Sequence, residues 1–136
     1  MPIMEWTPAL DVGVNEMNDE HKTILSLMNK LYDENEKGAS KDQLKKTIQE
    51  LGAFTMKHFA DEEAYQASIN YPDLTTHKAL HANLLKKFGA FQEGFDKGPG
   101  KVAPEFFNFL KFWLSSHIQG IDKKYGDHAK TVKKAS

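Results

Sequence analysis

The chain has 136 residues, a length typical of one domain with a substantial buried core. Its 18 basic residues, all lysine, nearly balance 19 acidic ones, and without arginine neither net charge nor residue type favours binding to nucleic acid. Cysteine is absent as well, which excludes disulfides, thiolate metal sites and iron–sulfur clusters.

The N-terminus lacks the basic start and apolar core of a secretory signal. The most apolar run, residues 106–114, is too short to span a bilayer, so we expect a cytoplasmic protein without a membrane span. We expect one domain over residues 1–136. Residues 1–18 contain Pro and Gly and have no helical period, which predicts an extended N-terminal arm anchored by Trp6.

The first two helical patterns have recognisable ends. The first helix is expected to start with Asn18 or Asp19 as its N-cap and to stop near Gly38. The second starts at Ser40, where Ser-x-x-Gln has the form of a capping box. It should end before Pro72, because the residue preceding a proline resists the helical conformation.

Two further helices complete the pattern. Asp73 is the expected cap of the third helix, which fades at residues 96–100, and Pro104 suits the first turn of the fourth. Residues 123–136 read as a short, lysine-rich and partly ordered tail. Short connections between four helices predict an all-α, up-down-up-down four-helix bundle over residues 19–122.

Two of these helices carry pairs of potential metal ligands four residues apart. The pairs are His58 with Glu62 and His77 with His81, and a spacing of four places both side chains on one helix face. Both pairs occupy positions that the apolar heptads assign to the buried seam. Buried imidazoles and carboxylates need partners, and a metal cluster would supply them.

The first and fourth helices offer further candidates. His21 and His117 lie on apolar stripes, and Asp122 follows His117 by five residues, which is about 140° of rotation in an α-helix. We therefore predict that the helix widens near Gly120, as in a π-type turn. A lone core histidine is usually structural and a helix-end aspartate is usually solvated, but five histidines on core stripes favour a shared site. His128 fits no stripe and is expected at the surface.

Imidazole and carboxylate without thiolate suit iron, manganese or zinc, and seven ligands are too many for one small ion. Two roughly octahedral irons offer about twelve positions, of which five imidazoles, two bridging carboxylates and a shared oxygen fill about eleven. One position stays open for a small molecule. The acidic neighbours of Glu62, Asp61 and Glu63, are expected to be solvated.

Four segments resemble the hemerythrin family, specifically the single-domain bacterial hemerythrins. They are Asp19-Glu20-His21-Lys22-Thr23-Ile24, His58-Phe59-x-x-Glu62-Glu63, His77-x-x-x-His81 and Trp113-Leu114-x-x-His117-Ile118-x-x-x-Asp122, and the resemblance runs from about residue 6 to residue 126. It implies a non-haem di-iron centre with an oxo or hydroxo bridge, in which both carboxylates bridge. Three histidines would hold one iron (His77, His81 and His117) and two the other (His21 and His58).

The resemblance also implies a function, which is reversible dioxygen binding for storage, transport or delivery, without net catalysis. Four apolar residues would line the oxygen pocket, although ordinary core packing explains them equally well: Ile24, Trp113, Leu114 and Ile118. One alternative is a di-iron enzyme acting on nitric oxide, peroxide or ferrous iron, which the absence of Glu-x-x-His motifs disfavours. Another is an oxygen-sensing or iron-sensing module, for which the chain offers no output domain.

Overall fold

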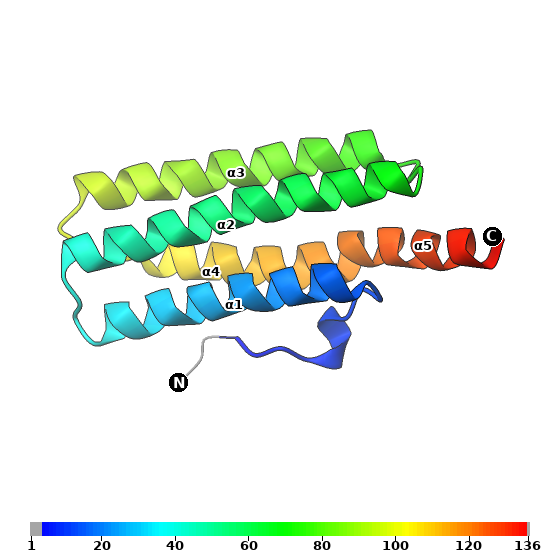
Figure 1. Cartoon of the computed structure of the whole chain (residues 1–136). Coiled ribbons are helices and arrows are strands. Elements are labelled where there is room, and N and C mark those ends of the chain that lie inside the picture. The colour runs from blue at the N-terminus through cyan, green and yellow to red at the C-terminus, as the bar shows by residue number, and fades with distance from the viewer. Residues whose placement is uncertain (1–3, 136) are drawn as a thin grey trace.

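The computed structural model describes the backbone of residues 4–135 and the side chains of residues 4–131. In this part of the chain every regular element is helical, and the elements are η1 (Pro8–Leu10), α1 (Asn15–Glu36), α2 (Lys41–Ser68), α3 (Leu74–Lys97), α4 (Pro104–Phe112), η2 (Trp113–Asp122) and α5 (Lys123–Ala135). Consecutive rods run antiparallel in Figure 1, and the last rod consists of α4, η2 and α5, which follow one another without a break. The predicted all-α, up-down-up-down bundle is confirmed. Among the described residues, none of these helices combines the length and the apolar character that a bilayer span requires.

The start of α1 differs from the prediction. The helix begins at Asn15, and Asn18 is already inside it, since its backbone N–H donates to the carbonyl of Val14 at 2.9 Å. The side chain of Asn18 does not cap the helix and instead forms hydrogen bonds with the N-terminal arm. It accepts a hydrogen bond from the backbone N–H of Val12 at 3.0 Å and donates one to the carboxylate of Asp11 at 2.8 Å.

The predicted cap of α2 is confirmed, because Oγ of Ser40 accepts from the backbone N–H of Gln43 at 3.1 Å. The Gln43 side chain does not bond back to Ser40 here and donates to Glu34 at 2.6 Å. The helix stops before Asn70, whose φ of 54° lies in the left-handed region. Asp73 occupies the predicted N-cap position, because α3 begins at Leu74. Its side chain makes no cap hydrogen bond, however, and its φ of −97° and ψ of 19° are not the extended values of a side-chain cap.

The fourth rod contains the widening that the spacing of His117 and Asp122 predicts. It extends beyond Gly120 over the whole of η2, which is a π-helix. At its end the backbone N–H of Lys123 donates to the carbonyl of Ile118, five residues earlier. Because a π-helix bonds each residue to the fifth one before it, His117 and Asp122 come to share a face.

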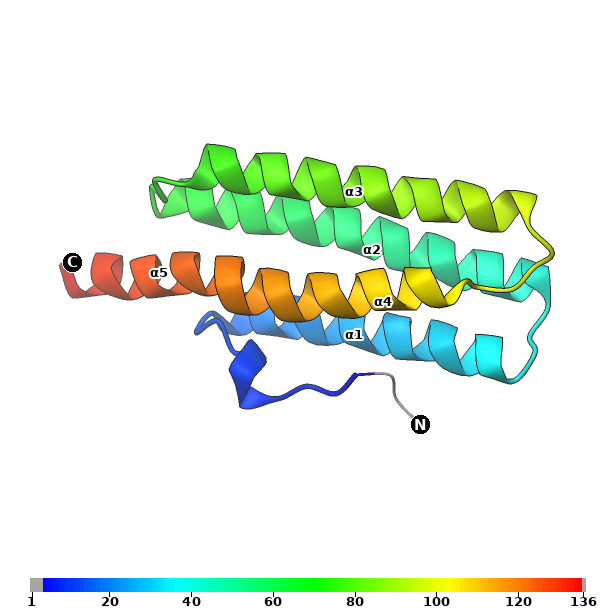
Figure 2. The ribbon, with the colours of Figure 1, turned by 180° about the vertical axis from the view of Figure 1, so that it is seen from behind.

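Residues 123–135, predicted as a short tail without a helix of its own, form α5, which continues the fourth rod past the ends of the other helices (Figure 2). Its inner face buries Tyr125 and Ala129, four residues apart. His128, expected at the surface, is half-buried, and its Nε2–H donates to the carbonyl of Ile69 at 2.9 Å. Because α5 is rich in lysines, the sequence pattern does not reveal the stripe of buried residues on its inner face.

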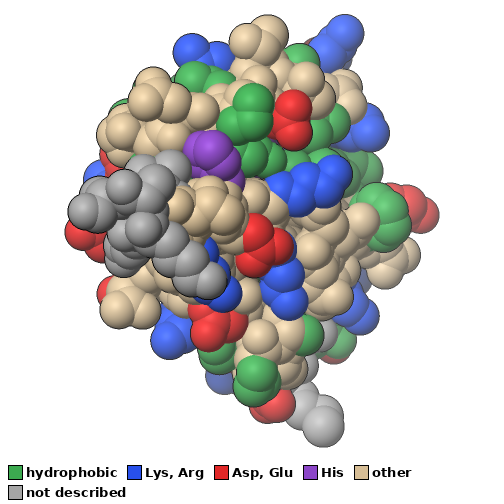
Figure 3. All heavy atoms as spheres, turned by 90° about the vertical axis from the view of Figure 1, so that its right-hand side faces the viewer, with side chains coloured by type: hydrophobic (Ala, Val, Ile, Leu, Met, Phe, Trp, Pro, Cys, Tyr) green, Lys and Arg blue, Asp and Glu red, His purple; other side chains and the backbone are tan. Residues whose placement is uncertain are grey.

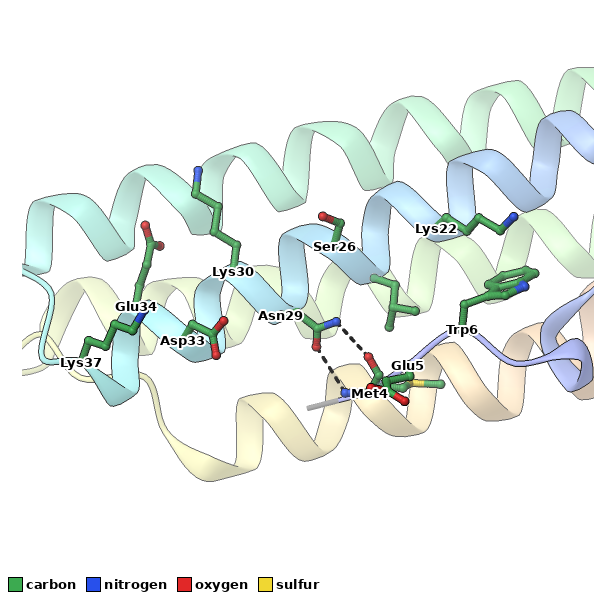
Figure 4. Close-up of a pocket in the computed structure, with 11 residues that line it drawn as sticks. Met4, Glu5, Trp6, Lys22, Ser26, Asn29, Lys30, Asp33, Glu34 and Lys37 are labelled. Atoms are coloured by element: carbon green, nitrogen blue, oxygen red, sulfur yellow. Dashed lines mark hydrogen bonds between the residues drawn. The ribbon is translucent and has the colours of Figure 1, made fainter. Parts of the chain in front are cut away.

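The N-terminal arm contains the short turn η1 and lies along α1. Leu10 and Val12 are buried, whereas Trp6, the predicted anchor, is only half-buried. The amide of Asn29 clamps the backbone of Met4, accepting from its N–H at 3.2 Å and donating to its carbonyl at 2.8 Å (Figure 4). The groove between the arm and α1 has a volume of about 720 Å³ and contains none of the predicted metal ligands.

Candidate metal centre

All seven predicted ligand residues are buried between the rods, and each rod contributes: His21 from α1, His58 and Glu62 from α2, His77 and His81 from α3, and His117 and Asp122 from η2. Their donor atoms form two groups, and within each group the atoms lie within 4.8 Å of one another. One group contains three histidines (His77, His81 and His117), and the other contains two (His21 and His58). Both carboxylates belong to both groups. The structure therefore brings the predicted set together, and metal binding by it stays a prediction.

Asp122 lies between the two groups of histidines. Its Oδ1 is 3.0 Å from Nε2 of His77 and 3.0 Å from Nε2 of His117. Its other oxygen, Oδ2, is 3.1 Å from Nε2 of His21. One carboxylate thus faces imidazoles from three different rods.

Glu62 has the same bridging position on the opposite rod. Its Oε1 lies 2.9 Å from Nε2 of His81, and its Oε2 lies 3.4 Å from Nε2 of His58. The hydroxyl of Tyr125 donates a hydrogen bond of 2.7 Å to Oε2. The sequence pattern does not indicate this contact, because it places Tyr125 in the predicted tail.

Several donor atoms at the middle of this cluster are buried without a hydrogen-bond partner among the described residues: both ring nitrogens of His21, Oε1 of Glu62, Nε2 of His81 and both oxygens of Asp122. Some lie within ion-pair distance of one another, yet none meets hydrogen-bond geometry. Unsatisfied buried polar atoms are costly, so the cluster needs a further partner at its centre. Imidazole nitrogens and carboxylate oxygens facing one another fit a divalent transition metal.

Two of the imidazoles are hydrogen-bonded to carboxylates through Nδ1, the ring nitrogen that faces away from the centre of the cluster. Glu20 Oε1 lies 2.6 Å from Nδ1 of His58, and Glu63 Oε2 lies 2.8 Å from Nδ1 of His81. The expectation that Glu63 is solvated is therefore wrong, and its side chain is only 25% exposed. When Nδ1–H donates to a carboxylate, the lone pair of Nε2 faces the centre, which is the tautomer that a metal needs.

Gln66 contacts the corresponding nitrogen of His77. Its amide nitrogen, Nε2, lies 2.6 Å from Nδ1 of His77, while the amide oxygen has no hydrogen-bond partner among the described residues. Turning the amide over would let its oxygen accept from Nδ1–H, the arrangement that leaves Nε2 of His77 facing the centre. Sequence reasoning missed both Glu20 and Gln66. Gln66 lies one turn beyond Glu62 on the inner stripe of α2, which was the available signal. Which histidine each residue meets depends on how the rods pack.

Removing a supporting charge should weaken metal binding without changing its stoichiometry. We expect Glu20→Gln and Glu63→Gln each to lower the affinity for ferrous iron by about 10-fold to 100-fold, because an amide polarises the imidazole less than a carboxylate does. Competition with a coloured chelator measures the affinity. Glu50→Gln is the matched control, since the Glu50 side chain is 40% exposed and its ion pair, at 3.6 Å, is with Lys30 rather than with a histidine of the cluster. Affinities equal to that of the control would contradict the supporting role.

The metal-free cluster holds protons that a metal would displace. Burial opposes a charge on His58, but hydrogen bonds with Glu20 and Glu62 outweigh it and raise its pKa to about 10. The pKa of His21 is raised for the same reason, since Asp122 and Glu62 overcome the cost of burial. Burial also opposes ionisation of Glu62, yet the imidazoles around it hold its pKa well below the usual range.

The four residues expected to line an oxygen pocket are all buried: Ile24, Trp113, Leu114 and Ile118. Phe59, which sequence reasoning missed, stacks on the ring of His81 with centroids 3.8 Å apart. The ring of Trp113 meets the ring of Phe59 edge to face, with the centroids 5.7 Å apart. The cluster therefore has an apolar wall, and its use as a dioxygen pocket stays a prediction.

Comparisons with known proteins agree over most of the chain. A family model described as the hemerythrin HHE cation binding domain matches residues 12–129. Bacteriohemerythrin of Methylococcus capsulatus is 33% identical over 127 residues, covering 93% of this chain and 96% of the relative. Hemerythrin-like protein of Naegleria gruberi is 35% identical over 120 residues, or 88% of each chain. A crystal structure of wild-type hemerythrin superposes with a TM-score of 0.83 at 32% identity, covering 92% of this chain and 96% of that one.

Proposed function

Because the chain belongs to the hemerythrin family, we propose that it binds dioxygen reversibly at a pair of iron ions, for storage, transport or delivery. The observation that carries this proposal is the division of seven buried residues into two groups that share both carboxylates. Two overlapping groups fit two metal ions with common bridging ligands, whereas one small ion has too few coordination positions for seven residues.

The two groups would hold the two irons unequally. His77, His81 and His117 would hold one iron, His21 and His58 the other, and Glu62 and Asp122 would bridge them. When bound, ferrous iron would supply electrons to dioxygen and would take them back when dioxygen leaves. The group with two histidines provides fewer protein donors, so it leaves more room for a small ligand.

The surroundings of the cluster favour a carrier over an enzyme. Phe59, Trp113 and Leu114 are buried beside the imidazoles, and they keep water away from the centre. Five imidazoles with two carboxylates also form a less anionic ligand set than the four carboxylates of Glu-x-x-His di-iron proteins. A less anionic set stabilises high-valent iron less, which favours binding of dioxygen over oxidation chemistry.

Reversibility is the test of this function. Anaerobic protein loaded with ferrous iron should develop a visible charge-transfer absorption band on mixing with oxygen, and the band should disappear when argon removes the gas. His58→Ala should lose the band, whereas His128→Ala should keep it, because His128 lies outside the cluster. A colour that never reverses would contradict a carrier. Sustained consumption of nitric oxide or peroxide would favour the enzyme instead.

Iron loading should release protons at neutral pH. The pKa of about 10 keeps metal-free His58 protonated at pH 7, and its Nε2 must lose that proton to bind iron. Affinity for ferrous iron should therefore rise with pH up to about pH 10 and fall as the solution becomes more acidic. Anaerobic calorimetry in buffers of different ionisation enthalpy measures the protons released. A binding enthalpy independent of the buffer would contradict this assignment.

A further inference from the structure

Three of the four tyrosines in the chain gather beside the metal cluster, because Tyr125 of α5 contacts the rings of both Tyr65 and Tyr71. Tyr125 is fully buried, and its hydroxyl donates to Oε2 of Glu62 at 2.7 Å. Through this bond an oxidisable side chain, Tyr125, directly contacts Glu62, which belongs to both ligand groups. The same bond provides an acceptor for the phenolic proton, which a tyrosine must lose when it loses an electron.

A second tyrosine connects this buried one to solvent. The ring centroids of Tyr125 and Tyr65 are 6.0 Å apart, and Tyr65 is only half-buried. Tyr65 lines a surface groove of about 320 Å³ together with Glu16, Gly126 and Lys130, among other residues. Charges of both signs are interspersed on this end of the bundle (Figure 3), so no strong field would repel a charged small molecule.

The other aromatic neighbours do not offer an equal route. Tyr71 lies 6.4 Å from Tyr125, but it is buried and its other ring neighbour is His128, at 5.6 Å, whose imidazole is hard to oxidise. The ring of Trp113 packs on Phe59, which in turn stacks on the ring of His81 and not on a ligand carboxylate. Neither has the contact with a ligand carboxylate that Tyr125 has.

We propose that Tyr125 and Tyr65 form a route by which one-electron oxidising equivalents leave the metal centre for the surface. The route rests on the proposed iron centre. Hydrogen peroxide is the oxidant that we consider, and it takes up two electrons and two protons to become two molecules of water. When only one of the two irons is ferrous, that iron supplies one electron, and Tyr125, the tyrosine bonded to a ligand carboxylate, supplies the second electron and one of the two protons, while solvent supplies the other proton.

Each step of the route balances. Tyr125 gives one electron to the centre and passes its phenolic proton along the hydrogen bond toward Glu62. The neutral Tyr125 radical then takes an electron from Tyr65 and a proton through Glu62, while the proton of Tyr65 leaves to water at its exposed edge. A small reductant such as ascorbate returns an electron to Tyr65, which takes a proton from water. This sequence spares the metal ligands from oxidation.

Electron paramagnetic resonance of freeze-quenched samples tests the route. Protein with two irons per chain, confirmed by metal analysis, and with one of them oxidised beforehand, should give a tyrosyl radical with hydrogen peroxide. Tyr125→Phe should abolish the signal. Tyr65→Phe should keep a radical that ascorbate reduces more slowly, and should remove the oxidised Tyr65 peptide seen by mass spectrometry. Tyr32→Phe is the matched control, because the ring of Tyr32 packs edge to face on Phe107, and Phe107 belongs to neither ligand group among the described residues.

The outcomes separate the route from the metal site and from the carrier function. Two bound irons without a tyrosyl radical would overturn the route alone, as would an undiminished radical in Tyr125→Phe. Should Tyr125→Phe fail to fold, equally fast reduction by ascorbate in Tyr65→Phe and the unaltered chain would overturn it. Failure to bind iron would overturn the route and the site together. A reversible oxygen band is a separate measurement, and its loss would not remove the radical.

Discussion

Glu62→Gln should reduce the iron content from two ions per chain to one or none. The Glu62 carboxylate belongs to both ligand groups and lies within 3.5 Å of Nε2 of four histidines: His21, His58, His77 and His81. An amide has nearly the same shape but cannot bridge two cations with two anionic oxygens. Metal analysis after loading and desalting measures the stoichiometry.

The neighbouring residue provides the matched control for this experiment. Glu63→Gln makes the same chemical change one position along α2, where the side chain contacts only the rear nitrogen of His81 among the cluster imidazoles. It should retain two irons, with the weaker affinity predicted above. Two irons in Glu62→Gln would contradict the bridging role. Equal losses in the two variants would mean that any charge removed from this region disrupts the site.

Gly126→Ala should produce the largest loss of stability among the glycine-to-alanine changes, because its added methyl has the closest contact. A Cβ built on Gly126 would lie 1.8 Å from the carbonyl oxygen of Val12, so the arm or α5 must move. Overpacking of this kind costs about 1–3 kcal/mol. Moving the arm would also expose Leu10 and Val12, which are buried. Urea unfolding measures the free energy, and limited proteolysis reports release of the arm.

Gly89→Ala is the control with the same added methyl. Gly89 is exposed in α3, and nothing lies within 4 Å of its ideal Cβ position. Alanine there should raise the free energy of unfolding by up to about 1 kcal/mol, because it forms helix better than glycine. If Gly126→Ala were as stable as Gly89→Ala and kept a protease-resistant arm, the close approach of the arm and α5 would not contribute to the free energy of unfolding.

The local features of the site could be predicted because helix geometry fixes them. His58 with Glu62, and His77 with His81, lie four residues apart, and any α-helix places such pairs on one face. Asp122 required a further step, since its distance from His117 only makes sense in a widened helix. There the spacing of the site residues predicted the backbone conformation.

Contacts between rods could not be predicted in the same way. Glu63 looked like an outer-face residue of α2, and its bond with His81 exists only because α3 packs beside it. Tyr125 lies in a segment whose lysines suggested a solvated tail, yet its inner side reaches Glu62. The start of α1 was misplaced because the side chain of Asn18 bonds the arm, a competition that helix signals do not encode.

The iron content of protein purified from iron-replete cells tests the central claim most directly. Seven buried side chains that form two overlapping ligand groups predict two irons per chain. One zinc per chain, or a folded protein that takes up no metal, would contradict a dinuclear iron centre and with it the proposed binding of dioxygen.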